Sequence, residues 1–363
     1  MILFDKQKME DANKKLFQNE NNLTIKNLIF IYTPIKVGST TLVTSIRIST
    51  INKFAVLHMH DEECLEVLTG IKNIKIKDII IYNSMLGKNV YVIDVYRSPI
   101  ERKISTFFEL IEMHFNNNTD EIMNYSLNRI TKRFNNIFLH LANEDYFMEK
   151  FEIPLPESFD FEKKYLLIKE NNIQYIKLRL CDSNNWGKIL STILNSEIFI
   201  INDYETSNKQ INLLYENFKN NYKIPSNLLE EIKKDSFLNY YFSLEEKEKY
   251  LNNWSSKQIE EEKVYTKEEY KLYFSITLEN RIRYNIQLNH YLDLGCKCNI
   301  CNNKRKVLIE KAKKGEIIKE RVCHNELVNE KLLKIKRIIN KKQMDLNIKG
   351  KNEGIGIIKM RLR

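Results

Sequence analysis

Short, continuous runs of apolar residues, separated by stretches with helical spacing, constrain the fold of this chain most strongly. The first run is NLIFIY, which begins at Asn27. Such runs, bounded by polar segments, are typical of strands buried on both faces of a parallel sheet. Strands that alternate with helices predict a mostly parallel α/β sheet flanked by helices, with right-handed crossovers. Further strands are expected at residues 54–58, 78–82, 90–96, 173–178 and 197–201.

Two regions depart from this alternation. Residues from about 110 to 165 are expected to form a helical insertion over the sheet, ending in an ordered loop with the sequence IPLPESFDF. After Ile201 the spacing becomes helical and stays so toward the C-terminus. We therefore divide the chain into a polar N-terminal segment (1–26), an α/β domain (27–254) and a basic helical C-terminal region (255–363).

The formal net charge of +10 favours acidic partners. Nucleotide phosphates, nucleic acid, an anionic glycan and a membrane surface all satisfy that condition. The sequence has no run of about 18 apolar residues, and its first residues do not read as a secretory leader. We expect a cytoplasmic protein without a membrane span.

The first expected strand leads directly into the loop TPIKVGSTTL, residues 33–42, which is followed by helical spacing. A strand, a tight loop and a helix present backbone N–H groups and the positive end of a helix dipole to an anion. The loop is not an ATP-type P-loop, in which a lysine directly follows the second glycine of G-x-x-x-x-G-K-[ST]. An ordinary β–α turn is the alternative interpretation. The candidate anion-binding residues are Lys36, Gly38, Ser39, Thr40 and Thr41.

A second candidate phosphate site follows the strand expected at 90–96, in the sequence YRSPIERKIS. Ser98 and Glu101 have the spacing of a capping box, and Pro99 would occupy the first helical position. Arg97 would then lie at the strand exit, with Ser105 about two helical turns beyond it. Arginine suits bidentate phosphate contact, and the serine hydroxyl adds a neutral hydrogen bond. The alternative is a surface arginine and an unrelated helix serine.

These two elements resemble the phosphate-binding motifs of sulfotransferases that use 3′-phosphoadenosine 5′-phosphosulfate (PAPS). Within that family the chain is similar to the glycan branch, which includes heparan sulfate 2-O-sulfotransferase and capsular polysaccharide synthesis proteins. The PIER sequence at 99–102, NKFAVLHMH at 52–60 and the segments IQYIKLRLCDSNNWGKIL and DSFLNYYFSLEEKEKYLNNW carry this resemblance. It covers roughly residues 27–254.

The resemblance implies a P-loop-like α/β core that transfers a sulfuryl group from PAPS to an acceptor hydroxyl, with a saccharide as the favoured acceptor. It places Lys36 and the loop amides at the 5′-phosphosulfate, and Arg97 with Ser105 at the 3′-phosphate. No catalytic metal is required by this scheme. A P-loop kinase or other NTPase is one alternative. A non-catalytic nucleic-acid-binding protein with a zinc-bearing basic tail is another.

The base that removes the acceptor proton is expected at the exit of the second strand, with His60 ahead of His58. Open α/β sheets bind ligands at this edge, and an imidazole that titrates near neutrality suits proton removal. The 2-O-sulfotransferases instead carry a basic histidine in an H-x-H run before the strand that leads to the 3′-phosphate arginine. This chain has IIIYNSM there, so the family's base does not transfer.

Other groups could serve as the base. Asp61 and Glu62 adjoin the same strand exit, although Asp61 is also expected to be the N-cap of a helix that ends at Gly70. His114 and His140 in the insertion are the next candidates.

A cysteine-rich pattern in the C-terminal region indicates a metal site. Cys296, Cys298 and Cys301 are followed by Cys323 and His324. Four thiolates, or three with the imidazole, suit a tetrahedral structural zinc, and the alternative is free cysteines in a helical tail. The lysine-rich end of the chain would be a solvated face, or an arm for nucleic acid or an acidic glycan.

Overall fold

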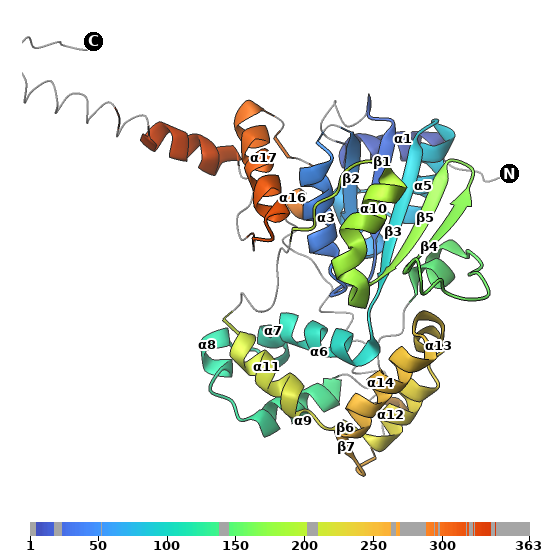
Figure 1. The fold of residues 1–363 in the computed structure, drawn as a ribbon, viewed down its shortest axis with the longest axis vertical. Helices are drawn as coiled ribbons and strands as arrows, with labels where there is room; N and C mark the ends of the chain where they lie inside the picture. Colours follow the sequence, from blue (N-terminus) through green and yellow to red (C-terminus); the bar gives the residue numbers. More distant parts are fainter. Residues whose placement is uncertain are drawn as a thin grey trace, which may run out of the picture.

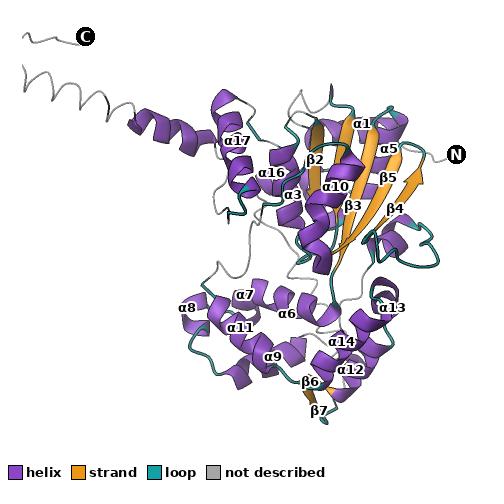
Figure 2. Ribbon diagram, viewed as in Figure 1, coloured by secondary structure: helices purple, strands orange, loops and turns teal. Residues whose placement is uncertain are grey.

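The structure, a computed structural model, describes residues 5–17, 24–51, 53–137, 145–201, 210–262, 266–268, 288–293, 295–296, 298–316, 318, 322, 324–334 and 338. Its largest part is a five-stranded sheet with helices on both faces (Figure 1). A separate layer of helices lies beyond the end of the third strand (Figure 2). The predicted α/β class with a mostly parallel sheet is confirmed.

The sheet has the strand order β2-β1-β3-β5-β4. Four of its strands pair in parallel and confirm four of the expected apolar runs. Because β1 and β3 are neighbours in this order, the segments that follow them emerge at the same edge of the sheet. These parallel strands are β1 (Asn27–Tyr32), β2 (Phe54–Met59), β3 (Asn89–Tyr96) and β5 (Ile173–Arg179).

The fifth strand, β4 (Tyr165–Glu170), was not predicted. It pairs antiparallel with β5, so that Glu170 lies opposite Ile173 across a two-residue turn. Asn171 in that turn has a φ of +52°, in the left-handed region that asparagine tolerates better than most residues. The Asn-Asn pair between two apolar runs is a hairpin signal that the sequence analysis missed.

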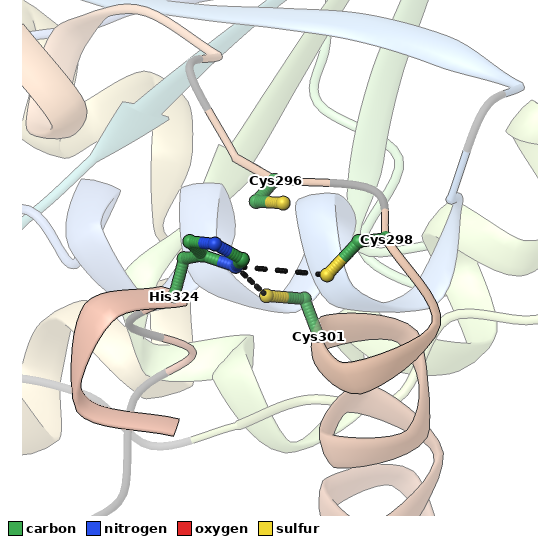
Figure 3. Close-up of side chains that lie close together, drawn as sticks. All are labelled: Cys296, Cys298, Cys301 and His324. Carbon is green, nitrogen blue, oxygen red and sulfur yellow. Dashed lines mark hydrogen bonds between the residues drawn. The ribbon is translucent and has the colours of Figure 1, made fainter. Parts of the chain in front are cut away.

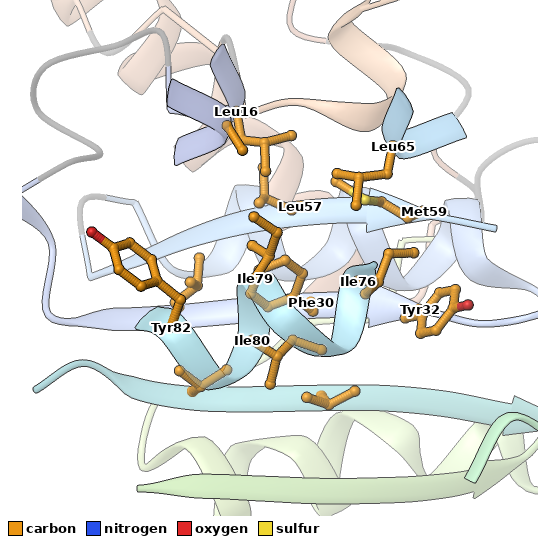
Figure 4. Close-up of a cluster of buried hydrophobic side chains, with 14 of the residues drawn as sticks. Leu16, Phe30, Tyr32, Leu57, Met59, Leu65, Ile76, Ile79, Ile80 and Tyr82 are labelled. Atoms are coloured by element: carbon orange, nitrogen blue, oxygen red, sulfur yellow. The ribbon is translucent and has the colours of Figure 1, made fainter. Parts of the chain in front are cut away.

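Helices bury both faces of the sheet. On one face lie α1 (Lys6–Leu16), α4 (Glu62–Thr69) and α5 (Ile76–Met85), over a cluster that includes Phe30 and Leu57 (Figure 4). Helix α1 of the N-terminal segment therefore belongs to the same core as the sheet, since its Leu16 is buried in this cluster. On the other face lie α3 (Ser39–Ser49) and α10 (Trp186–Leu194), over a cluster that includes Ile29 and Ile31.

The strand expected at 78–82 is wrong, because these residues belong to helix α5. Ile76, Ile79 and Ile80 are all buried, at the i, i+3, i+4 spacing of one helix face. A short apolar run fits either a buried strand or a buried helix, and here Ile76, which precedes the run, extends the apolar pattern to helical spacing.

The strand expected at 197–201 is also wrong, since these residues have no regular secondary structure and pair with none of the strands in the described ranges. Its amides bond to serine hydroxyls of α3 instead: Phe199 N donates to Ser49 Oγ (3.0 Å) and Ile201 N donates to Ser45 Oγ (2.8 Å). These hydroxyls satisfy the backbone groups that a sheet ladder would otherwise occupy.

The helical character expected for residues 110–137 is confirmed, but these helices do not lie over the sheet as expected, because their apolar side chains pack with other helices in the separate layer. The helices of the insertion pack with those that follow α10 into an aromatic core that includes Phe107, Phe218 and Trp254. The short strands β6 (Ile224–Pro225) and β7 (Gln258–Ile259) join within this layer. The helices are α6 (Pro99–Glu109), α7 (Ile111–Phe115), α8 (Thr119–Ile122), α9 (Leu127–Ile137), α11 (Asn212–Asn221), α12 (Ser226–Lys233), α13 (Ser236–Tyr241) and α14 (Leu244–Ser255).

The expected capping box at the start of α6 does not form. Ser98 is the N-cap, but its hydroxyl donates to the Glu101 carboxylate (2.7 Å) instead of accepting from the backbone. Glu101 also accepts from Tyr250 (3.0 Å) and Trp254 (3.1 Å) of α14. Tertiary contacts with α14 have therefore taken over the carboxylate that the capping box needed.

The C-terminal region packs on the sheet domain through two described helices, α16 (Leu288–Tyr291) and α17 (Asn299–Lys313). Leu308 of α17 shares a small buried cluster with Ile48 of α3 and Ile201. Figure 1 shows α16 and α17 beside α3 and β2. None of the helices in the described ranges has the length and apolar character needed to cross a membrane.

Candidate functional site

The expected strand, loop and helix are present at 27–49, with a tight loop between β1 and α3. Lys36 and Gly38 both adopt left-handed φ values, +64° and +87°. A Cβ on Gly38 would come within 3.0 Å of Leu180 and 3.1 Å of Trp186, so close packing as well as backbone conformation requires glycine here. Gly38 is the N-cap of α3 and has no side chain that could cap the helix. No side chain of the N-cap residue therefore occupies the N–H groups at this helix start, which is the position where helices can bind anions.

Arg97 brings the second motif against this loop. It follows β3, and its Nη1 donates to the backbone carbonyl of Lys36 at 2.6 Å. Arg102, one turn into α6, is buried and donates from Nε to the carbonyl of Ile35 at 3.4 Å. Two arginines from the β3–α6 segment thus hold the backbone of the β1–α3 loop, and sequence reasoning had identified only one of them.

The charges at this edge compensate one another. The Lys36 ammonium pairs with the Glu109 carboxylate at the end of α6, 3.1 Å away. The Lys36 side chain is only 15% exposed, so solvent screens this pair less than a surface pair. Burial lowers the pKa of Arg97, and the neighbouring Tyr215 and Glu101 oppose that effect. Tyr215 and Glu109 lie far from the loop in sequence, and no local pattern pointed to them.

The predicted hydroxyl residues differ in accessibility. Ser39, in the first turn of α3, is buried, whereas Thr40 and Thr41 are half-buried. Ser105 lies on α6 as expected, but it is only 4% exposed. A phosphate could reach the guanidinium of half-buried Arg97 more easily than the Ser105 hydroxyl.

A buried charge network stabilises the strand ends beneath the loop. Lys177 of β5 is 1% exposed and contacts the carboxylates of Asp94 and Asp145. Tyr241 donates its hydroxyl hydrogen to Asp145. Burial raises the pKa of Asp94, and the Lys177 ammonium opposes that rise. Thr33, which opens the loop, accepts at Oγ1 from Val95 N (3.1 Å) and so ties the loop to β3 next to Asp94.

The predicted bases lie at the exit of β2, where they are deeply buried. His58 and His60 have ring centroids 4.4 Å apart, and His60 is 8% exposed. His60 Nδ1 is 2.8 Å from the carbonyl oxygen of Thr33. Asp61 caps α4 by accepting from Cys64 N (2.8 Å), as expected, and the helix ends at Gly70 in the left-handed region.

Two of the other proposed bases, Glu62 and His114, make contacts that contribute to the packing of the fold. Glu62 accepts from the hydroxyl of Tyr32 (3.2 Å). His114 is buried in the helical layer, and its ring stacks on Phe107 at 5.1 Å. Burial, together with the neighbouring Arg133, lowers the pKa of His114 to about 4. His140 lies outside the described residues.

The cysteine pattern forms a compact cluster that could hold a metal (Figure 3). The potential ligand atoms of Cys296, Cys298, Cys301 and His324 all lie within 4.8 Å of one another. His324 Nδ1 is 3.6 Å from Cys298 Sγ and 3.5 Å from Cys301 Sγ. Tetrahedral zinc with ordinary bond lengths would separate sulfur and nitrogen ligands by about 3.6 Å. Of the two predicted ligand sets, the one with three thiolates and the imidazole is assembled, while Cys323 lies outside the described residues.

The position of Cys298 favours its thiolate form. It is the N-cap of α17, and the backbone N–H of Cys301 lowers the pKa of Cys298 to about 6. By contrast, burial and the neighbouring thiols raise the pKa of Cys301 to about 12. A bound cation would favour the deprotonated form of every thiol in this cluster.

A cavity of about 390 Å³ lies in the helical layer, away from the loop. It is lined by basic side chains of α9, together with residues at the end of α7. The lining residues are Met113, His114, Phe115, Asn116, Arg129, Lys132, Arg133 and Asn136.

Comparison with protein-family models, with curated proteins and with solved structures yields no match to this chain. The functional interpretation therefore depends on the residues described above.

Proposed function

We propose that this chain is a PAPS-dependent sulfotransferase with a P-loop-like core. The observation that carries the proposal is the 2.6 Å hydrogen bond from Arg97 to the carbonyl of Lys36. It joins two candidate phosphate sites that are separated by some sixty residues in the sequence. A donor with phosphate groups at both its 5′ and 3′ positions needs two such sites side by side.

Each part of the donor has a matching group on the protein. The N–H groups at the start of α3 and the Lys36 ammonium bind the 5′-phosphosulfate, and Arg97 with Ser105 binds the 3′-phosphate. In the reaction, the bond between sulfur and the 5′-phosphate oxygen breaks while a bond from sulfur to the acceptor oxygen forms. Lys36 stabilises the negative charge that develops on the leaving phosphate. The acceptor proton passes to a base, and His60 and His58 remain the predicted candidates for this role.

The same features disfavour ATP as the substrate. The loop has no lysine directly after its glycine, and a nucleotide without a 3′-phosphate would leave Arg97 without its ligand. The acceptor is proposed to be a saccharide hydroxyl, on the strength of the family resemblance alone. The Cys3His cluster, defined by Cys296, Cys298, Cys301 and His324, is proposed to hold a structural zinc because all four ligand positions are supplied by protein.

Sulfuryl transfer from PAPS to a panel of saccharides tests the proposal. The purified chain should form 3′-phosphoadenosine 5′-phosphate together with a sulfated product. Lys36→Ala should lower turnover by roughly 10²–10³-fold at saturating donor, as loss of other preorganised charge-stabilising groups does. Lys72→Ala is the matched control, because Lys72 is exposed and lies outside both motifs. Full turnover by Lys36→Ala would show that the assigned role is wrong.

A further inference from the structure

Three histidines meet where the C-terminal region touches the edge of the sheet. His58 belongs to β2, His60 follows it directly, and His290 comes from α16. The His58 ring centroid lies 4.4 Å from that of His60 and 4.6 Å from that of His290. One ring nitrogen from each residue lies within 4.8 Å of the others. His58 and His60 are buried, and His290 is half-buried.

A hydrogen bond fixes the tautomer of one ring. The Thr33 carbonyl oxygen, 2.8 Å from His60 Nδ1, can only accept a hydrogen bond. Nδ1 therefore carries the proton in the neutral ring, and Nε2 keeps its lone pair. Histidines that bind metals usually donate their other N–H to a carbonyl or carboxylate in this way, which orients the ring and raises its basicity.

Arg47 of α3 holds the third histidine in place. Its guanidinium donates to the carbonyl of Val56 in β2 (2.8 Å) and to the carbonyls of His290 (3.4 Å) and Tyr291 (3.2 Å). Tyr291 in turn stacks on the His58 ring, with centroids 5.5 Å apart and planes 17° apart. Leu292, the next residue, is fully buried in the core cluster. The backbone of α16 is thus fixed on β2 by contacts that do not involve the imidazole of His290.

We propose that His58, His60 and His290 bind a divalent transition-metal ion that joins the C-terminal region to the edge strand of the sheet. Three neutral imidazoles suit zinc, cobalt, nickel or copper better than magnesium or calcium, which prefer oxygen ligands. Tetrahedral zinc would bring the three nitrogens to about 3.3 Å from one another, so the rings would close in slightly on binding. This site is separate from the Cys3His cluster, since the two share no ligand.

His60 can act either as a metal ligand or as the base that accepts the acceptor proton, but not as both. A metal at Nε2 would occupy the ring atom that could otherwise take the acceptor proton. The proposed donor site depends on Lys36 and Arg97 and holds with either outcome.

Cobalt binding to the full-length chain tests the site. Equilibrium dialysis against Co²⁺ gives the number of ions bound, and the absorption spectrum separates the two sites because only thiolate ligands give sulfur-to-cobalt charge-transfer bands. We expect His290→Ala to bind one ion fewer than the wild type while keeping those bands. The difference spectrum should then show visible cobalt bands without a thiolate contribution. Leu288→Ala, on the exposed side of the same helix, is the matched control and should bind as the wild type does.

Equal cobalt binding and identical spectra for wild type and His290→Ala would overturn the proposal. If His290→Ala also loses the thiolate bands, the substitution has disturbed the C-terminal region as a whole. The number of cobalt ions bound by His60→Asn then tests the site instead. Loss of one nitrogen-ligated ion in His60→Asn supports the site, and an unchanged count rejects it.

Discussion

The guanidinium of Arg97 donates a hydrogen bond to the backbone carbonyl of Lys36, across 2.6 Å. This contact joins the segments that follow two adjacent parallel strands, and Lys36 itself has a left-handed backbone conformation. Arg97 can therefore act on the donor in two ways, by direct contact with phosphate and by fixing the loop that carries Lys36. The first two predictions concern this pair.

Arg97→Ala should weaken binding of 3′-phosphoadenosine 5′-phosphate by roughly 10- to 100-fold. Hydrogen bonds to charged groups contribute about 1.5–3 kcal/mol, and the loop would also lose its anchor. Calorimetric titration measures the change. Lys188→Ala removes a positive charge from the exposed face of α10 and should leave affinity unaltered. An Arg97→Ala protein with wild-type affinity would refute the 3′-phosphate assignment.

Glu109→Gln should strengthen binding of the same nucleotide by about two- to fivefold, because it frees Lys36 from its ion pair. The pair spans 3.1 Å, and its side chains are 15% and 26% exposed. The gain should shrink as salt is added, since screening weakens the charge that Lys36 offers. Glu121→Gln, on the exposed side of α8, controls for the change in net charge. Weaker binding by Glu109→Gln would mean that the carboxylate helps to position Lys36.

Removal of metal should destabilise the C-terminal region without abolishing donor binding. The thiols of Cys298 and Cys301 lie within 3.6 Å of the His324 ring, and a bound zinc would stabilise the segments that carry these ligands. After dialysis against a chelator, proteolysis should cut the region around 296–334 faster, and titration should still detect nucleotide binding. Cys181→Ser, at an exposed cysteine outside the cluster, should behave as the wild type. Protein that never contains metal, with freely titrating thiols at the cluster, would contradict the zinc assignment.

Acid should destabilise the helical layer through His114. Burial holds the pKa of this ring at about 4, below its ordinary value of 6.5. Between these values the unfolded chain binds a proton that the folded chain does not, so stability falls as the pH drops from 6.5 toward 4. His114→Phe keeps the stacking on Phe107 and removes the titration. Urea unfolding measures the free energy of unfolding at each pH. Between pH 6.5 and 4 this free energy should fall less in the variant than in the wild type, by up to roughly 3 kcal/mol. Identical pH profiles would show that His114 titrates normally.

The strand and loop framework was predictable because its signals are local. The apolar runs at Asn27 and Val90 led to β1 and β3, although α3 begins at Ser39, inside the segment that had been expected to be loop as far as Leu42. Local signals failed where an apolar run is compatible with both a strand and a helix. At residues 78–82 the helical spacing of the isoleucines outweighed their β-branched composition. Local signals failed also where a backbone found unexpected partners, as Ile201 did in the hydroxyl of Ser45.

Contacts between distant residues were not predictable from the sequence alone. The partner of Lys36, Glu109, is 73 residues away on another helix. His290 comes from the C-terminal region, yet it completes a cluster with His58 of the second strand. No spacing rule connects such residues, because the strand order and the packing of α16 on β2 bring them together.

The most direct test of the proposed function compares nucleotide binding by calorimetry, with 3′-phosphoadenosine 5′-phosphate and ATP titrated into the same protein preparation. The proposal predicts that the 3′-phosphorylated nucleotide binds at least roughly 10-fold more tightly, because only it gives Arg97 a phosphate partner. The preference should disappear in Arg97→Ala. Equal affinity for the two nucleotides, or tighter binding of ATP, would contradict the assignment of this chain as a PAPS-dependent sulfotransferase.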